Sequence, residues 1–591
     1  MAVWFSLFVA IYSYCRYFLS YNYFFVEQFS FFRFSREYAE NTLSQPGGLS
    51  KYLADFLTQF YFYPEIGPLI TATIGVLLTI LLDLSWQKIS HHRYYIPILS
   101  ALPALTLIWI ETDFNYYLSG TVSLLLAVGA FYMYMRLAQS LSFYIRFVLL
   151  VALSWPVNFL LGPNSLLMVA LCAVYELNRK EKRSLLSLLA LPLTCIFPVV
   201  LYHAEVGGEL YSQLLPEGYY VDRLPAPLFC YLPWATVLLN IVLAKLCSRN
   251  ALADKATESF MSRCLHSIFV IALQFIAIIG FMHWGVNHYN LSKNYEAKAF
   301  DYYSRVGNWE ALLKSEHLRA SENFMHTCYQ NLALSSLNMM GDKLFSFPQL
   351  GLSGLAIKWN KTVNSSVLLS DVYWQACDIA LAQEMAFEGM IASRDGVNPR
   401  LLMRLVQTNL VSGNYPVAQK YINLLEDTYS YAAQANKYKV MLFNDEAVLA
   451  DAELGPRRIG MHGTTGLTNT QSFADNLQQI MQHNPNMLPA FHYFGSMCLL
   501  VKDMVTFKEF VNRYHETPSL SDMPVHFQEA VVLIYENEKE RWDELGVSSS
   551  VKERYDQYRK LFLENRGTPL LHQKMARTFG NTYWFYYMFK K

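Results

Sequence analysis

The sequence predicts an all-α protein in two parts, a bundle of about nine transmembrane helices followed by a soluble domain of paired amphipathic helices. Hydrophobic residues make up 53% of the 591 residues and charged residues only 16%, below the roughly 25% typical of soluble proteins. Residues 1–286 contain 33 charged side chains and residues 287–591 contain 61. The second part shows helical periodicity and almost no strand-like alternation.

Membrane-length segments fill the first 286 residues. A helix needs about 20 mostly apolar residues to cross the hydrocarbon core. We count nine candidate spans, near residues 2–24, 67–85, 95–111, 116–135, 143–161, 164–178, 184–203, 227–248 and 265–286. The sixth is short and follows Gly162 and Pro163, so the alternative is a re-entrant hairpin formed with the fifth.

Loop charges predict the orientation of these segments, because cytoplasmic loops accumulate Lys and Arg. One alternating set of loops holds twelve basic residues, whereas the other holds four basic and eleven acidic residues. We therefore expect an inner-membrane protein with a cytoplasmic N-terminus. Nine spans would place the C-terminal domain, residues 287–591, in the periplasm, and one helix more or fewer would reverse its side.

Arg16 lies inside the first expected span, where a charge is costly unless it is paired. Glu27 falls on the same helical face but about 16 Å away by helical rise. A direct pair with Glu27 is therefore not expected. A partner within the membrane is the first expectation, and snorkelling of Arg16 toward the cytoplasmic surface is the alternative.

The first external loop, residues 25–66, is longer than the other loops and rich in aromatic residues. After the breaker at 46–48, residues 49–61 place apolar side chains at helical spacing, with Lys51 and Asp55 off that face. An amphipathic helix on the outer membrane surface is the first expectation. Packing of this helix on the other spans is an equal alternative.

The C-terminal half repeats pairs of amphipathic helices. Residues 401–427 place Gly413, Tyr415, Ala418 and Tyr421 where two antiparallel helices can pack around a turn, which resembles a tetratricopeptide repeat. Weaker matches to the same pattern occur at residues 302–313, 331–347, 372–393 and 490–514. No fixed period is kept, so an irregular helical domain is the alternative. The stretch 455–470 is expected to form a long exposed loop.

The candidate chemistry lies on the external side of the membrane half. Equal numbers of basic and acidic residues, 47 each, argue against nucleic-acid binding, and the C-terminal half has no zinc, phosphate-loop or nucleophile-elbow motif. Glu27 follows the first span directly, and Glu111 and Asp113 close the third. A carboxylate at this depth can act as a general base or hold a divalent cation. The alternative is that these acids only mark loop ends.

This layout resembles the glycosyltransferase C superfamily, multi-pass enzymes that use polyprenyl-phosphate-linked sugars as donors. The segment VEQFSFFRFSREY looks like their first-loop motif, with Glu27 at the position of the catalytic acid. The ETD at 111–113 is similar to the acidic pair with which oligosaccharyltransferases of this superfamily hold a metal. Spans followed by lumenal repeats also resemble the repeat-containing O-mannosyltransferases. The sequence departs from the family in having Glu where Asp is frequent, and in lacking a motif of the WWDYG kind.

The resemblance implies roles for these residues. Glu27 would activate or orient an acceptor hydroxyl, and Glu111 and Asp113 would bind Mg²⁺ or Mn²⁺ or shape the acceptor side. Cations near the outer surface would meet the donor phosphate, to which the planar fork of Arg is suited: Arg33, Arg36 and Lys51. The helical repeats would bind a protein or glycan acceptor.

Two other function classes stay open. The first is a non-enzymatic scaffold for envelope protein assembly, in which the spans are an anchor and the repeats a docking surface. The second is a lipid or glycan transporter, although its usual sign, paired interrupted helices in two halves, is not visible. A general likeness to large multi-pass membrane proteins of Bacteroidota implies no activity.

Overall fold

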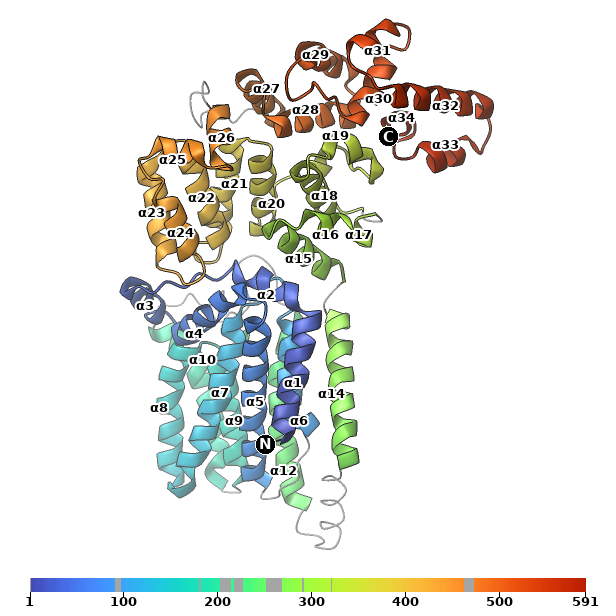
Figure 1. The fold of residues 1–591 in the computed structure, drawn as a ribbon. Helices are drawn as coiled ribbons and strands as arrows, with labels where there is room; N and C mark the ends of the chain where they lie inside the picture. Colours follow the sequence, from blue (N-terminus) through green and yellow to red (C-terminus); the bar gives the residue numbers. More distant parts are fainter. Residues whose placement is uncertain are drawn as a thin grey trace. The chain divides into compact units, whose positions relative to one another are not determined.

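The computed structural model describes residues 2–90, 97–179, 182–201, 214–216, 227–250, 268–289, 292–319, 322–461 and 472–590. Every regular element within these ranges is a helix, which confirms the all-α class. The chain divides into two compact units near the expected boundary (Figure 1). Unit 1 comprises Met1–Tyr295 and Thr428–Ser430, and unit 2 comprises Glu296–Asp427 and Tyr431–Lys591.

Unit 1 is a bundle of apolar helices that pack side by side (Figure 1). They are α1 Ala2–Phe18, α5 Ile66–Ser90, α6 Pro97–Ile110, α7 Leu118–Leu137, α8 Phe143–Leu161, α9 Asn164–Asn178, α10 Ala190–Leu201, α12 Leu232–Asn250 and α14 Ile268–Tyr289. In the described residues five helices are long and apolar enough to cross a membrane, namely α5, α7, α8, α12 and α14 with their flanking turns. The expected count of nine is therefore not confirmed, because α1, α6, α9 and α10 are shorter.

Hydrogen bonds between helix ends show that neighbouring helices alternate in direction. Ser123 near the start of α7 donates to the carbonyl of Leu161 at the end of α8, at 2.6 Å. At the opposite end of these helices, Arg146 near the start of α8 pairs with Glu176 near the end of α9, with Nε–Oε2 at 3.0 Å. Tyr134 of α7 donates to the same carboxylate at 3.1 Å. The Arg146 and Glu176 side chains are only 3% and 2% exposed, so the ion pair together with the Tyr134 hydroxyl holds three helices together inside the bundle.

The first expected span is interrupted at Leu19. α1 ends at Phe18, and a second helix, α2, runs from Ser20 to Glu27. Arg16 therefore lies in the last turn of α1, where it forms a bidentate pair with Glu65 at 2.8 and 2.9 Å. Snorkelling of Arg16 toward the cytoplasmic surface stays a prediction. The partner is an acid from the segment that precedes α5.

The first loop contains three further helical segments, α3 Arg36–Leu43, α4 Gly48–Thr58 and the 3₁₀ turn η1 Gln59–Phe62. α4 is the helix predicted after the breaker. It packs on α7 and α8, and its buried side chains include the small residues Ser50, Ala54 and Thr58. The packing alternative is thus confirmed for this side of the helix. Leu53 and Leu57 on the large apolar face are half-buried, and placement of that face at a membrane surface stays a prediction.

Unit 2 is built from consecutive helices, most of them joined by short turns (Figure 1). They are α15 Ser292–Arg305, α16 Trp309–Leu313, α17 Glu316–Arg319, α18 Phe324–Ser336, α19 Met340–Lys343, α20 Val363–Gln375, α21 Ile379–Ala392, α22 Pro399–Val411, α23 Tyr415–Glu426, α24 Ala432–Lys439, α25 Asp445–Ala450, α26 Leu454–Met461, α27 Phe473–His483, α28 Leu488–Val501, α29 Met504–Tyr514, α30 Val525–Ile534, α31 Glu540–Glu544, α32 Ser549–Asn565, α33 Leu571–Phe579 and α34 Tyr583–Phe589. The longer connection between α19 and α20 contains the 3₁₀ turns η5 Leu344–Ser346 and η6 Gly351–Gly354. α15 begins within unit 1 and continues into unit 2.

One turn geometry recurs at each of the five segments where the sequence suggested a helical pair. One residue has positive φ, and the next N–H bonds the carbonyl five residues earlier at 2.7–2.9 Å, as in a Schellman motif. The positive-φ residues are Gly307, Asn338, Cys377, Gly413 and Lys502. In four of the five the following residue is an Asn or Asp at the next helix N-cap: Asn308, Asp378, Asn414 and Asp503.

These turns confirm helical hairpins, but they do not by themselves identify tetratricopeptide repeats, and that assignment stays a prediction. The expectation of a loop at residues 455–470 was wrong for residues 455–461, because they belong to helix α26. Residues 462–470 lie outside the described part of the chain.

Two buried polar networks join helices within unit 2. Arg400 of α22 pairs with Asp301 of α15 at 2.6 Å and with Asp371 of α20 at 2.5 Å. Glu529 of α30 accepts from His526 Nδ1 at 2.9 Å and from the backbone N–H of Tyr583 at 2.7 Å. The second network anchors the C-terminal helix α34 to α30, deep in the larger apolar core.

Candidate functional site

The acids predicted to be catalytic lie at one end of unit 1, where α6 ends and α7 begins. The side-chain amide of Asn22 in α2 donates to the backbone carbonyl of Glu111 at 2.8 Å. Phe25 packs edge-on against Phe114 with ring centroids 4.9 Å apart. α2 therefore packs on the turn that carries Glu111, and Glu27, the last residue of α2, lies on an adjacent segment.

Glu111 is held by hydroxyl groups from two helices. Its Oε1 accepts from Thr121 of α7 at 2.9 Å, and its Oε2 accepts from Thr71 of α5 at 3.2 Å. The hydroxyl oxygens of Tyr116 and Thr121 lie 3.2 Å apart. Only 9% of Glu111 is exposed. The turn thus directs this carboxyl group inward, toward the bundle.

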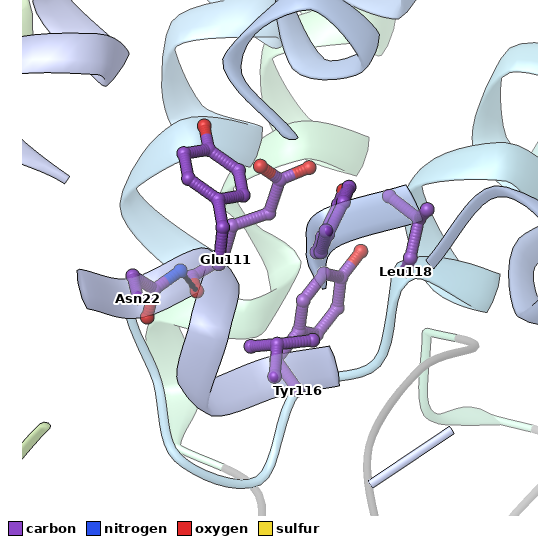
Figure 2. A pocket seen from close by; sticks show the side chains of 7 residues that line it. Asn22, Glu111, Tyr116 and Leu118 are labelled. Carbon is purple, nitrogen blue, oxygen red and sulfur yellow. Dashed lines mark hydrogen bonds between the residues drawn. The ribbon is translucent and has the colours of Figure 1, made fainter. Parts of the chain in front are cut away.

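A small pocket adjoins the Glu111 carboxyl group. Figure 2 shows Asn22, Glu111, Tyr116 and Leu118 around it, and the complete lining also includes Tyr23, Val26 and Tyr61. Its free volume is about 10 Å³, roughly the space that one water molecule needs. A sugar or a lipid phosphate does not fit in this conformation, so either ligand requires the lining segments to separate.

Burial makes Glu111 titratable near neutral pH. It lies in the turn after α6, beyond the last residue of that helix. Desolvation raises the pKa of its carboxyl group to about 7, although the hydrogen bonds from Thr121 and Thr71 partly oppose this effect. A carboxyl group with such a pKa is present in both protonation states at neutral pH, as general acid–base catalysis requires.

Asp113 faces different partners from Glu111. Its Oδ1 accepts the backbone N–H of Asn115 at 2.9 Å, which closes the local turn. In the described ranges, no group of three or more His, Cys, Asp or Glu side chains is placed to hold a metal ion. The arrangement of Glu111 and Asp113 does not form a ready metal centre, and the expected Mg²⁺ or Mn²⁺ site stays a prediction.

A sequence profile of DUF6057, a family of unknown function, matches residues 1–590. The chain belongs to this family. The match spans both units of this DUF6057 protein. No curated protein and no solved structure matches the chain. The resemblance to the glycosyltransferase C superfamily therefore stays a prediction.

The other predicted site residues of the DUF6057 chain do not line the Glu111 pocket. Glu27 is 1% exposed and follows Val26, a pocket residue, but is not itself among the lining side chains. Arg36 is exposed and pairs with Glu40 within α3 at 2.6 Å. Arg33 lies between α2 and α3, and Lys51 lies on α4, both partly exposed. Their expected contact with a donor phosphate is untested.

Sequence reasoning missed the residues that hold Glu111 in place. Thr71, Thr121 and Tyr116 come from three separate segments, and single hydroxyls in apolar runs carry no spacing signal. The one available clue was the two threonines near the external ends of two expected spans, on the same side as Glu111.

Proposed function

We propose that this DUF6057 protein is an integral membrane protein, inserted through unit 1. Exposed large apolar side chains on several helices support this proposal, since extensive exposed apolar surface marks an interaction or membrane surface. They include Ile145 and Val148 of α8, Leu239 and Leu246 of α12, and Phe269, Leu273, Ile276 and Ile279 of α14. We propose nine crossings, with α1, α6, α9 and α10 as short spans that complete the alternation.

The proposed topology has a cytoplasmic N-terminus and a periplasmic C-terminal domain. Tyr289, the last residue of α14, packs on Trp109 near the end of α6 with ring centroids 5.5 Å apart. The chain therefore leaves α14 at the end of unit 1 that carries Glu111. This contact supports a topology in which the first loop, the Glu111 turn and the chain that follows α14 lie on the same side of the membrane.

The proposed activity is sugar transfer from a polyprenyl-phosphate donor to a protein or glycan acceptor. The observation that carries it is the buried, hydroxyl-held Glu111, on a segment adjacent to Glu27. As the acceptor oxygen bonds to the anomeric carbon, the carboxylate of Glu111 takes the hydroxyl proton. The bond from carbon to phosphate oxygen breaks, and the phosphate leaves with that electron pair. Glu27 orients the acceptor, and Arg33, Arg36 and Lys51 attract the phosphate.

Glycan transfer in cells that depend on the protein tests this proposal. We expect Glu111→Gln to reduce transfer by at least about 100-fold, as loss of a general base does, and Glu27→Gln to reduce it too. Glu37→Gln is the control, because Glu37 is exposed in the first turn of α3 and has no proposed role. Wild-type transfer by the Glu111→Gln variant at normal protein abundance would refute the catalytic role.

The alternative is a non-enzymatic scaffold for envelope assembly. The small size of the pocket beside Glu111 favours it, because its free volume of about 10 Å³ has room for roughly one water molecule in this conformation. Site-specific crosslinking through the outward faces of unit 2 in living cells would recover a defined partner if this alternative holds. In that case the Glu111→Gln variant would retain its cellular function.

A further inference from the structure

The 3₁₀ segment η3, Lys182–Leu189, has its polar side chains inside and its apolar side chains outside. Ser184 is 2% exposed and Ser187 is 1% exposed, and the Ser187 hydroxyl donates to the Ser184 carbonyl at 2.5 Å. The leucines of the segment are all exposed: Leu185, Leu186, Leu188 and Leu189. In water this arrangement would leave the apolar side chains unshielded. The pattern therefore indicates that η3 faces hydrocarbon.

The exposed leucines continue onto α8 and α10, both of which pack against η3. On α10 the exposed side chains follow Leu189 at intervals of three or four residues, along one side of the helix: Leu193, Ile196 and Val200. On α8 three side chains are more than half exposed: Tyr144, Ile145 and Val148. We call these exposed side chains of η3, α8 and α10 the η3 surface. The 12 residues of α10 rise about 18 Å, which is comparable with half of the roughly 30 Å hydrocarbon core, so an acyl chain can lie along this surface.

An exposed guanidinium lies at the edge of the η3 surface. Arg183 Nη1 donates to the hydroxyl of Tyr144, and the guanidinium carbon lies 5.1 Å from the centre of the Tyr144 ring. These contacts hold the Arg183 head group on α8, one residue from Ile145. A guanidinium has five N–H groups. Within the described part of the chain this hydrogen bond uses one of them, so the others can bind a ligand.

The charge around Arg183 is basic. Lys88 in the last turn of α5 and Arg136 in the last turn of α7 lie at the same end of unit 1 as the start of α8. The acids that the structure describes at this end are Asp83 and Glu176, and each is at most 2% exposed. Glu176 belongs to the buried ion pair described above. In the described ranges, no exposed carboxylate at this end therefore competes with an anionic ligand for Arg183.

We infer that Arg183 and the η3 surface form a binding site for an anionic phospholipid. Its phosphate group binds the guanidinium, whose planar fork suits phosphate oxygens, and its acyl chains lie along α8 and α10. The Tyr144 hydroxyl positions the guanidinium at the level where the apolar surface begins. Lys88 and Arg136 make the local potential positive, which favours a lipid with net negative charge over a zwitterionic one. The inference rests on the proposed membrane insertion of unit 1 and is independent of the proposed enzyme activity.

Native mass spectrometry of the purified full-length protein in detergent tests this site without an activity assay. Phosphatidylglycerol and phosphatidylcholine with identical acyl chains are titrated separately. We expect phosphatidylglycerol to bind more tightly than phosphatidylcholine. Arg183→Gln should weaken phosphatidylglycerol binding about fivefold, which is the contribution of one basic side chain at an anionic membrane surface. Arg541→Gln is the matched control, because Arg541 is an exposed arginine of unit 2 that pairs with Glu544.

Equal binding of the two lipids, or wild-type binding of phosphatidylglycerol by Arg183→Gln, would overturn the site. Displacement of the lipid by millimolar inorganic phosphate would also overturn it, because binding would then not depend on the acyl chains. If Arg183→Gln does not fold, Tyr144→Phe provides a second test. It removes only the hydroxyl that positions the guanidinium, and should weaken phosphatidylglycerol binding about twofold while leaving phosphatidylcholine binding unchanged.

Alkaline carbonate extraction of cell membranes tests the insertion of unit 1 separately. Release of the protein by carbonate would refute the proposed insertion and the lipid site with it. Resistance to carbonate together with equal binding of the two lipids would overturn the lipid site alone.

Discussion

Replacing Glu529 by alanine tests whether the buried network between α30 and α34 holds the C-terminal helix in place. One oxygen, Oε2, accepts both the Nδ1–H of His526 and the backbone N–H of Tyr583. The Nε2 of His526 accepts from the backbone N–H of Phe345 at 3.3 Å. The histidine is therefore the neutral tautomer with its hydrogen on Nδ1.

The structure gives the size of the effect. Alanine leaves two buried donors without an acceptor, and each such donor costs about 1–3 kcal/mol. We therefore expect a loss of about 2–6 kcal/mol in the free energy of unfolding. Glu529→Gln can keep an acceptor oxygen at the same place, so its loss should be smaller, about 1 kcal/mol.

The assay is hydrogen–deuterium exchange of the full-length protein, with peptides from α30 and α34 followed by mass spectrometry. Exchange in α34 should rise strongly in Glu529→Ala and slightly in Glu529→Gln. Glu516→Ala is the matched control, because Glu516 is 90% exposed and 3.8 Å from its histidine partner, and such surface changes stay within about 0.5 kcal/mol. Equal exchange in Glu529→Ala and Glu516→Ala would refute the reasoning.

Three more predictions follow from buried groups. Arg146→Met leaves Glu176 buried without its ion-pair partner, so we expect the free energy of unfolding to fall by about 3–5 kcal/mol. The thermal unfolding temperature should fall with it. The double variant Arg146→Met with Glu176→Leu should recover most of the lost stability. Burial raises the pKa of Asp378 to about 6, above its value in the unfolded chain. The free energy of unfolding should therefore fall by up to about 3 kcal/mol as the pH rises from about 4 to 6. In Asp378→Asn, urea unfolding should no longer show this pH dependence. A Cβ at Gly495 would lie 2.3 Å from the ring of Phe527, so Gly495→Ala should lower the urea midpoint, and an unchanged midpoint would show that the ring yields freely.

The sequence predicted the helices of both units because apolar periodicity depends only on local spacing. It overestimated the first span, since residues 2–24 stay apolar across Leu19, where the structure begins a new helix. It also missed the pair between Arg16 and Glu65, which are far apart along the chain and meet only when α1 packs on α5.

The candidate site was predictable in part. Glu27 and Glu111 follow apolar segments, so their position at helix ends could be inferred from the sequence. The different surroundings of Glu111 and Asp113 could not be inferred from the sequence, because they depend on the turn. The turn directs the Glu111 carboxylate inward to Thr121 and places the Asp113 carboxylate against the backbone N–H of Asn115. Packing, rather than composition, selects the acid that is shielded from water.

The repeated turn in unit 2 suggests how such a chain can change length. The turn recurs a sixth time at Gly546, where the N–H of Val547 bonds the Trp542 carbonyl at 2.8 Å. Its six examples share a backbone geometry and not a residue, since glycine occupies only three of the positive-φ positions. The joints at Cys377 and Gly413 are therefore interchangeable in shape, and each leads into a helix that begins after an Asp or Asn. Removing residues 378–413 would reconnect one intact turn to one intact helix start. The stretch between two such turns is thus a unit that duplication or deletion can add or remove without a new connection having to evolve.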